Sequence, residues 1–111
     1  MKKEVAATVV LVTVFFVVSV IGLSGRMDAA EKSGEALFKE FCVMCHPDGG
    51  NIVNPKKTLH KKDREANNIK TEADIIKNMR NPGPGMTQFD AKTISDKDAG
   101  EIAEYILKSY K

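Results

Sequence analysis

The hydrophobic pattern divides the chain into two parts at about residue 30. Residues 5–25 carry no charge and are mostly apolar, whereas residues 31–111 mix charged, polar and apolar positions. Lys2 and Lys3 precede the apolar run, and a basic start followed by an apolar stretch is typical of an export signal. We therefore predict that residues 1–30 are a targeting segment with a short linker, and that residues 31–111 form the functional domain.

The length of the apolar run leaves two fates open. The apolar region of a signal peptide has about 7–15 residues and a membrane span needs about 20, so residues 5–25 are long enough for either. A cleavage site is only weakly marked, and we favour cleavage near Ser24 over a retained membrane anchor. In both cases the domain lies in the periplasm or another extracytoplasmic space, soluble or anchored by residues 5–25, because the basic start stays in the cytoplasm.

Residues 31–111 are predicted to form an all-α domain with three main helices. The first runs to about Cys42, the second ends before Pro82, and the third continues to the C-terminal end of the chain. Thr71 and Asp74 match a capping box at the start of the second helix. The residues expected to cap the three helices are Ser33, Thr71 and Ser95.

Each predicted helix has apolar residues at helical spacing, and we expect these faces to form the core. Between the first two helices the chain is mostly loop, with a short helix expected near residues 62–66. No segment alternates with the period of a strand. The apolar positions are Leu37, Phe38 and Phe41 in the first helix, Ile75, Ile76 and Met79 in the second, and Ile102, Ala103, Tyr105, Ile106 and Leu107 in the third.

Composition and charge narrow the class of function. The chain has no Trp, and only 6% of its residues are aromatic, so a large apolar cofactor would complete its small core. A formal net charge of +2 argues against a role in binding nucleic acid, which favours a strong basic excess.

Residues 42–46 read Cys-Val-Met-Cys-His, which is the c-type haem attachment pattern. Thiols at Cys42 and Cys45 lie about one turn apart and can reach two vinyl groups on one edge of a porphyrin. His46 then offers an imidazole nitrogen to the iron. The motif predicts one covalently attached haem c per chain.

Three other uses of the two cysteines fit less well. A redox dithiol with this spacing belongs near a βαβ unit, which the pattern does not predict. A structural zinc site needs four nitrogen or sulfur ligands, and outside residues 42–46 the only further His or Cys is His60. A disulfide between cysteines so close in sequence would stabilise the fold little.

The second axial ligand of the iron has four candidates. Met44 lies within the attachment turn, Met79 has the helical position of a core methionine, and His60 lies in a lysine-rich loop. Met86 follows the turn-rich run Asn-Pro-Gly-Pro-Gly at residues 81–85, which has little reason to hold a core methionine. We expect Met86 to ligate, in the Met/His pattern of electron-transfer cytochromes; the alternative is an exposed loop methionine.

With these motifs the sequence resembles the class I cytochromes c, and most of all the small single-haem carriers of cyanobacterial and algal photosynthesis. In those carriers a Pro follows the ligand methionine, whereas this chain has Thr87 at that position. The loop before Met86 also contains two extra prolines, Pro82 and Pro84. The resemblance implies a cytochrome c fold, with three to five short helices around one haem. The matching positions are Gly34, Phe38, Gly49, Gly50, Asn51, Pro55, Thr58, Leu59, Met86, Phe89, Ile102, Ala103, Tyr105 and Ile106.

The predicted function is one-electron transfer, with haem iron cycling between Fe(II) and Fe(III) in a respiratory or related chain. His46 and Met86 together would leave no open iron position for a substrate, so we do not expect an enzyme. A haem enzyme or a gas sensor with an open or labile sixth site is the alternative if Met86 does not ligate.

The expected partners are redox proteins that donate and accept electrons. They would dock at the haem edge near Val43 and Met44, or on a basic loop at residues 56–64. The simpler interpretation, which we favour, is that this loop is only a solvated surface. The more specific interpretation is that it steers acidic redox partners to the protein by electrostatic attraction. A membrane is expected as a partner only if the N-terminal segment is retained. The basic residues of the loop are Lys56, Lys57, Lys61, Lys62 and Arg64.

Overall fold

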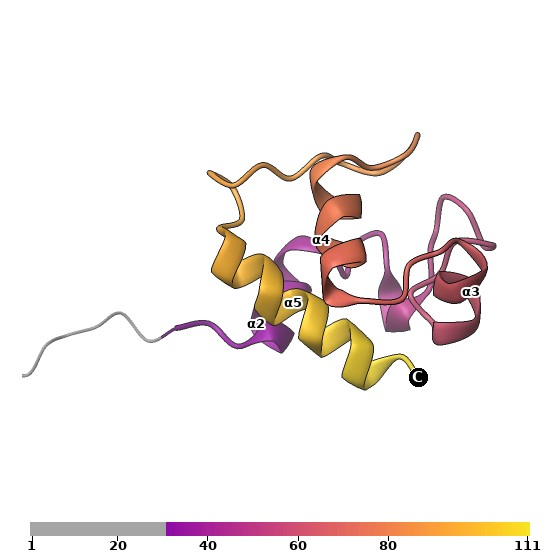
Figure 1. The fold of residues 1–111 in the computed structure, drawn as a ribbon, viewed down its shortest axis with the longest axis horizontal. Helices are drawn as coiled ribbons and strands as arrows, with labels where there is room; N and C mark the ends of the chain where they lie inside the picture. Colours follow the sequence, from indigo (N-terminus) through magenta and orange to yellow (C-terminus); the bar gives the residue numbers. More distant parts are fainter. Residues whose placement is uncertain (1–30) are drawn as a thin grey trace, which may run out of the picture. The chain divides into compact units, whose positions relative to one another are not determined.

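Helices make up all the regular secondary structure of residues 31–111, the part of the chain that the computed structural model describes. The all-α prediction is confirmed. Within that part, no helix has the length and apolar character needed to cross a membrane. The predicted targeting segment, residues 1–30, lies outside the described residues. In chain order the elements are α2 (Gly34–Phe41), the 3-10 helix η1 (Pro47–Gly49), α3 (Lys61–Ala66), α4 (Glu72–Arg80) and α5 (Asp96–Ser109) (Figure 1).

Local capping explains where the main helices begin. At α4, the Thr71 hydroxyl accepts from the Asp74 amide at 3.2 Å, and the Asp74 carboxylate accepts from the Thr71 amide at 2.9 Å. The amides of Lys70 and Thr71 lower the pKa of the Asp74 carboxyl, because they stabilise its charged form. The hydroxyls of Ser33 and Ser95 accept from the amides of Ala36 and Asp98 at the starts of α2 and α5, so all three predicted starts are confirmed.

The core lies where α5 packs across α2 and against α4 (Figure 1). Two predicted members of the third apolar face, Tyr105 and Leu107, are only half-buried, as is Ile76 of the second. Ile94, which precedes α5, was not predicted to be in the core but is almost fully buried. The buried apolar residues are Leu37, Phe38, Ile75, Met79, Ile94, Ala99, Ile102, Ala103 and Ile106.

The crossing of α2 and α5 depends on Gly34. A Cβ atom at this position would lie 2.8 Å from the Glu101 carbonyl carbon, closer still to its oxygen, and 3.0 Å from the Tyr105 Cβ. The Phe38 ring packs one turn along α2, with its centroid 5.3 Å from that of Tyr105. The two helices therefore approach closely enough that only glycine fits between them.

Gly34→Ala should destabilise the protein by about 1–3 kcal/mol, because the added methyl group meets backbone rather than a flexible side chain. Gly100→Ala is the matched control on α5, where a Cβ has nothing within 4 Å. That change should raise stability by roughly 0.5–1 kcal/mol, since alanine is the better helix former. Denaturant unfolding measures both, and equal effects of the two substitutions would contradict the proposed close crossing.

Candidate functional site

A cavity bounded by α3, α4 and the loops that flank them contains the predicted cofactor-binding residues. Cys42, Cys45, His46 and Met86 all line it, whereas Met79 is buried in the core. The other two candidate axial ligands, Met44 and His60, lie outside the lining and are exposed. The apolar part of the wall consists of Phe41, Val53, Leu59, Ile69, Ile75, Pro84 and Phe89.

The attachment segment continues directly from the end of α2. Cys42 is the C-terminal cap of that helix, and its carbonyl accepts from the amides of Cys45 at 3.2 Å and His46 at 2.9 Å. This turn brings both sulfur atoms to the same cavity. Within residues 31–111 neither cysteine is in a disulfide. Burial raises the pKa of the Cys42 thiol to about 11, so the free thiol is protonated at neutral pH.

The imidazole of His46 is oriented by a hydrogen bond to the backbone. Its Nδ1 lies 2.7 Å from the Gly50 carbonyl oxygen. A carbonyl only accepts, so in the neutral ring the proton is on Nδ1 and the lone pair is on Nε2. Metal-bound histidines generally donate their second N–H group to a carbonyl or carboxylate in this way. His46 thus has the tautomer that an Nε2 metal ligand requires.

The thioether of Met86 also has a polar neighbour in the cavity. Asn78 of α4 directs its Nδ2 to the Met86 sulfur at 3.5 Å. A thioether sulfur has two lone pairs, so this contact leaves one available to a metal. Sequence reasoning missed Asn78, although its position three residues after Ile75 places both on one face of α4, toward the cavity.

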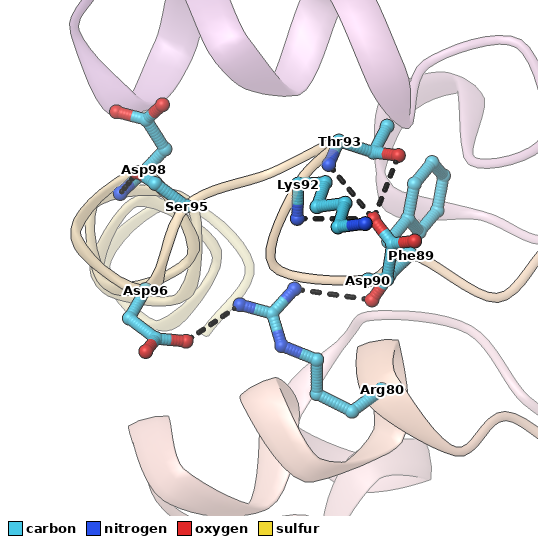
Figure 2. Close-up of polar contacts among 8 residues, drawn as sticks. All are labelled: Arg80, Phe89, Asp90, Lys92, Thr93, Ser95, Asp96 and Asp98. Atoms are coloured by element: carbon cyan, nitrogen blue, oxygen red, sulfur yellow. Dashed lines mark hydrogen bonds and ion pairs between the residues drawn. The ribbon is translucent and has the colours of Figure 1, made fainter.

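The loop that carries Met86 is hydrogen-bonded, on the C-terminal side of that residue, to the C-terminal end of α4. The Phe89 amide donates to the Met79 carbonyl at 3.0 Å, and the Gln88 side chain donates to the Arg80 carbonyl at 2.9 Å. The Arg80 guanidinium donates to the Phe89 carbonyl at 3.0 Å and pairs with Asp96 at 2.8 Å (Figure 2). These bonds constrain the loop even though no proline follows Met86.

The segment after this loop is folded around Asp90. One oxygen of the Asp90 carboxylate accepts from the amides of Lys92 and Thr93 and from the Thr93 hydroxyl, at 2.8–3.0 Å (Figure 2). The bonds from Thr93, more than any other contact, lower the pKa of this carboxyl. The turn leads directly to buried Ile94 and so connects the Met86 loop to the core.

Gly85 allows the loop to reach the other side of the cavity. Its φ of +90° lies in the left-handed region, and a Cβ there would lie 2.8 Å from the Val53 Cγ1. Both the backbone conformation and the close approach favour glycine. The residue before Met86 is therefore in direct contact with the loop at residues 51–59.

The donors and walls of the cavity fit a haem. Two thiols on one turn, an imidazole with a free Nε2 and a thioether lie around a mainly apolar cavity. Soft sulfur and imidazole nitrogen are the donors that hold haem c. Zinc fits less well, because residues 31–111 contain no cluster of three or more His, Cys, Asp or Glu able to hold a metal ion.

Arg64 departs from the expectation that the basic loop is a solvated surface. Lys56, Lys57, Lys61 and Lys62 are exposed as expected, but Arg64 is only 4% exposed and lines the cavity. The prediction for Arg64 was wrong because α3 turns this side chain inward, where backbone carbonyls accept its hydrogen bonds.

Comparisons with known proteins show the family and the fold of this chain. The family described as "Cytochrome C oxidase, cbb3-type, subunit III" matches residues 29–106. Cytochrome c6 of Rippkaea orientalis is 35% identical over 95% of this chain and 92% of its own length, and cytochrome c6 of Pyropia yezoensis is 36% identical over 96% and 94%. The structure of OmcF, an outer membrane cytochrome from Geobacter sulfurreducens, is 47% identical with a TM-score of 0.70, covering 71% of this chain and 100% of that one.

Proposed function

Since the chain belongs to the class I c-type cytochromes, which transfer electrons through covalently bound haem c, we propose which of its residues bind that haem. Cys42 and Cys45 are the attachment points, and His46 and Met86 are the two axial ligands. The single observation that carries this assignment is that all four line one apolar cavity.

The contacts of the two axial residues support their roles. His46 presents Nε2 because its Nδ1 proton is donated to the Gly50 carbonyl, and the loop that carries Met86 is hydrogen-bonded to α4 through Gln88 and Phe89. A ligand held on a constrained loop keeps its position when the charge on the metal changes. The reorganisation energy of electron transfer is therefore small. Asn78 withdraws electron density from the Met86 sulfur and so adjusts its strength as a donor.

Two protein ligands would leave no iron position for a substrate, and this favours an electron carrier over an enzyme. The haem supplies a one-electron exchange between ferrous and ferric iron, and the protein supplies ligands, burial and a docking surface. A haem enzyme or gas sensor would need Met86 to be absent from the iron or easily displaced. A reductive titration tests the proposal, which predicts a single one-electron transition and only poor binding of carbon monoxide by the ferrous protein.

The cellular location of the protein is inferred from its relatives and its N-terminal sequence. The chain resembles proteins named cytochrome c6 and OmcF. Together with the apolar run at residues 5–25, they support a periplasmic or other extracytoplasmic location. Retention of that run would make the protein a membrane-anchored carrier, and its cleavage would release a soluble one.

An exposed apolar patch beside the attachment turn is the proposed docking surface for redox partners. The patch consists of Val43, Met44, Ile52 and Val53, which are 40%, 85%, 64% and 57% exposed. The Ile52 amide donates a hydrogen bond to the Cys45 carbonyl at 3.0 Å. Residues 52–53 therefore lie next to the attachment turn that carries residues 43–44. Apolar contact at this edge would bring a partner near the cofactor.

The exposed lysines next to this patch favour an acidic partner. Lys56 and Lys57 follow Val53 closely in sequence, and the exposed Lys57 also lines the cavity. A positive surface at the electron exit accelerates encounters with anions and weakens with added salt.

Replacing Lys56 and Lys57 together by glutamate should slow oxidation of the ferrous protein by ferricyanide, a small anionic oxidant, by roughly tenfold at low ionic strength. The difference should shrink as salt is added. Lys92→Glu plus Lys111→Glu is the control, since it makes the same change in net charge at two other exposed positions. Equal slowing by both double variants would show that net charge, and not this patch, governs the encounter. Stopped-flow absorbance measures the rates.

A further inference from the structure

We propose that Arg64 binds a propionate carboxylate of the haem and serves as its counter-ion. This inference rests on the proposed function, which locates the haem in the cavity, and it assigns a further binding residue there. Arg64 is the one buried charged or polar residue within residues 31–111, and it lines the cavity. A guanidinium is always protonated at physiological pH, so this is a buried positive charge.

Two hydrogen bonds hold Arg64 in position without neutralising it. Its Nε donates to the Leu59 carbonyl at 2.7 Å, and its Nη2 donates to the Tyr110 carbonyl at 3.3 Å. Tyr110 lies at the far end of the chain, beyond α5, so the guanidinium links α3 to the C-terminus. Both acceptors are uncharged. They use two of the five N–H donors of the guanidinium and leave three for another acceptor.

No carboxylate of residues 31–111 forms an ion pair with Arg64. The two acidic residues of α3 are engaged elsewhere: Glu65 pairs with Lys61 at 3.9 Å, and the Asp63 carboxylate accepts from the Thr58 hydroxyl. Burial of a charge without a counter-ion is costly, because the charge loses its hydration and gains no compensating attraction. The arrangement therefore favours an anion that enters the cavity with the cofactor.

The chemistry of the haem meets this need. Each haem carries two propionate carboxylates, and a planar guanidinium matches a carboxylate with paired N–H donors. Lys57 also lines the cavity, but its exposed side chain offers a solvated point charge. Arg64, already fixed by two backbone carbonyls, loses little side-chain freedom when it binds a carboxylate. Its positive charge would also favour ferrous over ferric iron.

The test compares Arg64→Gln and Arg64→Lys with Lys62→Gln, which removes an exposed charge from the same helix. Haem should remain attached in all of them, because the cysteines are unchanged. At a fixed electrode potential, Arg64→Gln should lower the ferrous-to-ferric ratio by about tenfold, since the propionate charge would be left uncompensated in a low-dielectric interior. Arg64→Lys should give a smaller loss, and Lys62→Gln should have little effect.

A crystal structure of the parent holoprotein supplies the direct measurement, which stands even if Arg64→Gln fails to fold. A guanidinium nitrogen should lie within about 3.2 Å of a propionate oxygen. The inference is overturned if Arg64 contacts only backbone carbonyls or a solvent anion there, or if Arg64→Gln and Lys62→Gln shift the potential equally. A parent chain without covalent haem would instead overturn the proposed function, so the two failures are distinguishable.

Discussion

A chain in which both Cys42 and Cys45 are replaced by alanine should contain no covalently bound haem. The two thiols are the only cysteines in the sequence, and no other side chain can form the thioether bonds. The cavity that they line has mainly apolar walls, which would be exposed to water without the cofactor. We therefore expect the double variant to lose the haem and most of its cooperative folding, because a domain of this size has little other core.

Intact-mass analysis after denaturation tests this expectation. The parent should show the mass of one haem and no alkylatable thiol, and the double variant should show neither haem nor thiol. Val43→Ala is the matched control, since it changes the same turn without removing a sulfur atom, and it should keep the haem. Haem that survives denaturation on the double variant would contradict the attachment at these cysteines.

Met86→Ala should keep the haem but open one side of the iron. Cys42, Cys45 and His46 are unchanged, so attachment should persist. Loss of the thioether should allow water or a nearby nitrogen to approach the iron, and a harder ligand stabilises the ferric state, so the reduction potential should fall. The ferrous variant should bind carbon monoxide readily, whereas the ferrous parent should bind it poorly.

Two further substitutions separate ligation from packing. Met79 is 3% exposed and packs in the core, so Met79→Ala should cost about 2–5 kcal/mol of stability without opening the iron. His60 is exposed, its ring packed edge-on against Tyr110 with the centroids 5.6 Å apart, and His60→Ala should leave the spectrum unchanged. Carbon monoxide binding by either variant, with none by Met86→Ala, would reassign the axial ligand.

The starts of the three main helices, which depend on neighbouring residues, were predicted correctly from the sequence. The helices start at Ser33, Thr71 and Ser95 because each side chain bonds an amide only three residues away. The attachment motif, which stays a prediction, could be found from the sequence because it needs only five consecutive residues, 42–46. Met86 could be singled out because prolines and glycines precede it, which made a core position improbable.

Features that depend on tertiary placement were missed. The inward direction of Arg64 is set partly by the Tyr110 carbonyl, 46 residues away along the chain. Asn78 acquires its role only when the Met86 loop folds back onto α4. Tyr105 remains half-buried although its Cβ lies beside Gly34 where α2 and α5 cross. A one-dimensional pattern does not specify which helix covers a given side chain.

The absorption spectrum of the oxidised holoprotein tests the central claim most directly. If His46 and Met86 both bind the iron, the ferric protein should be low-spin and should show the weak far-red band of a thioether-to-iron transition. The band should be absent from Met86→Ala and unchanged in Met79→Ala. A parent protein that lacks the band and has the spectrum of a high-spin, open iron site would contradict the assignment of Met86 and favour a haem enzyme or gas sensor.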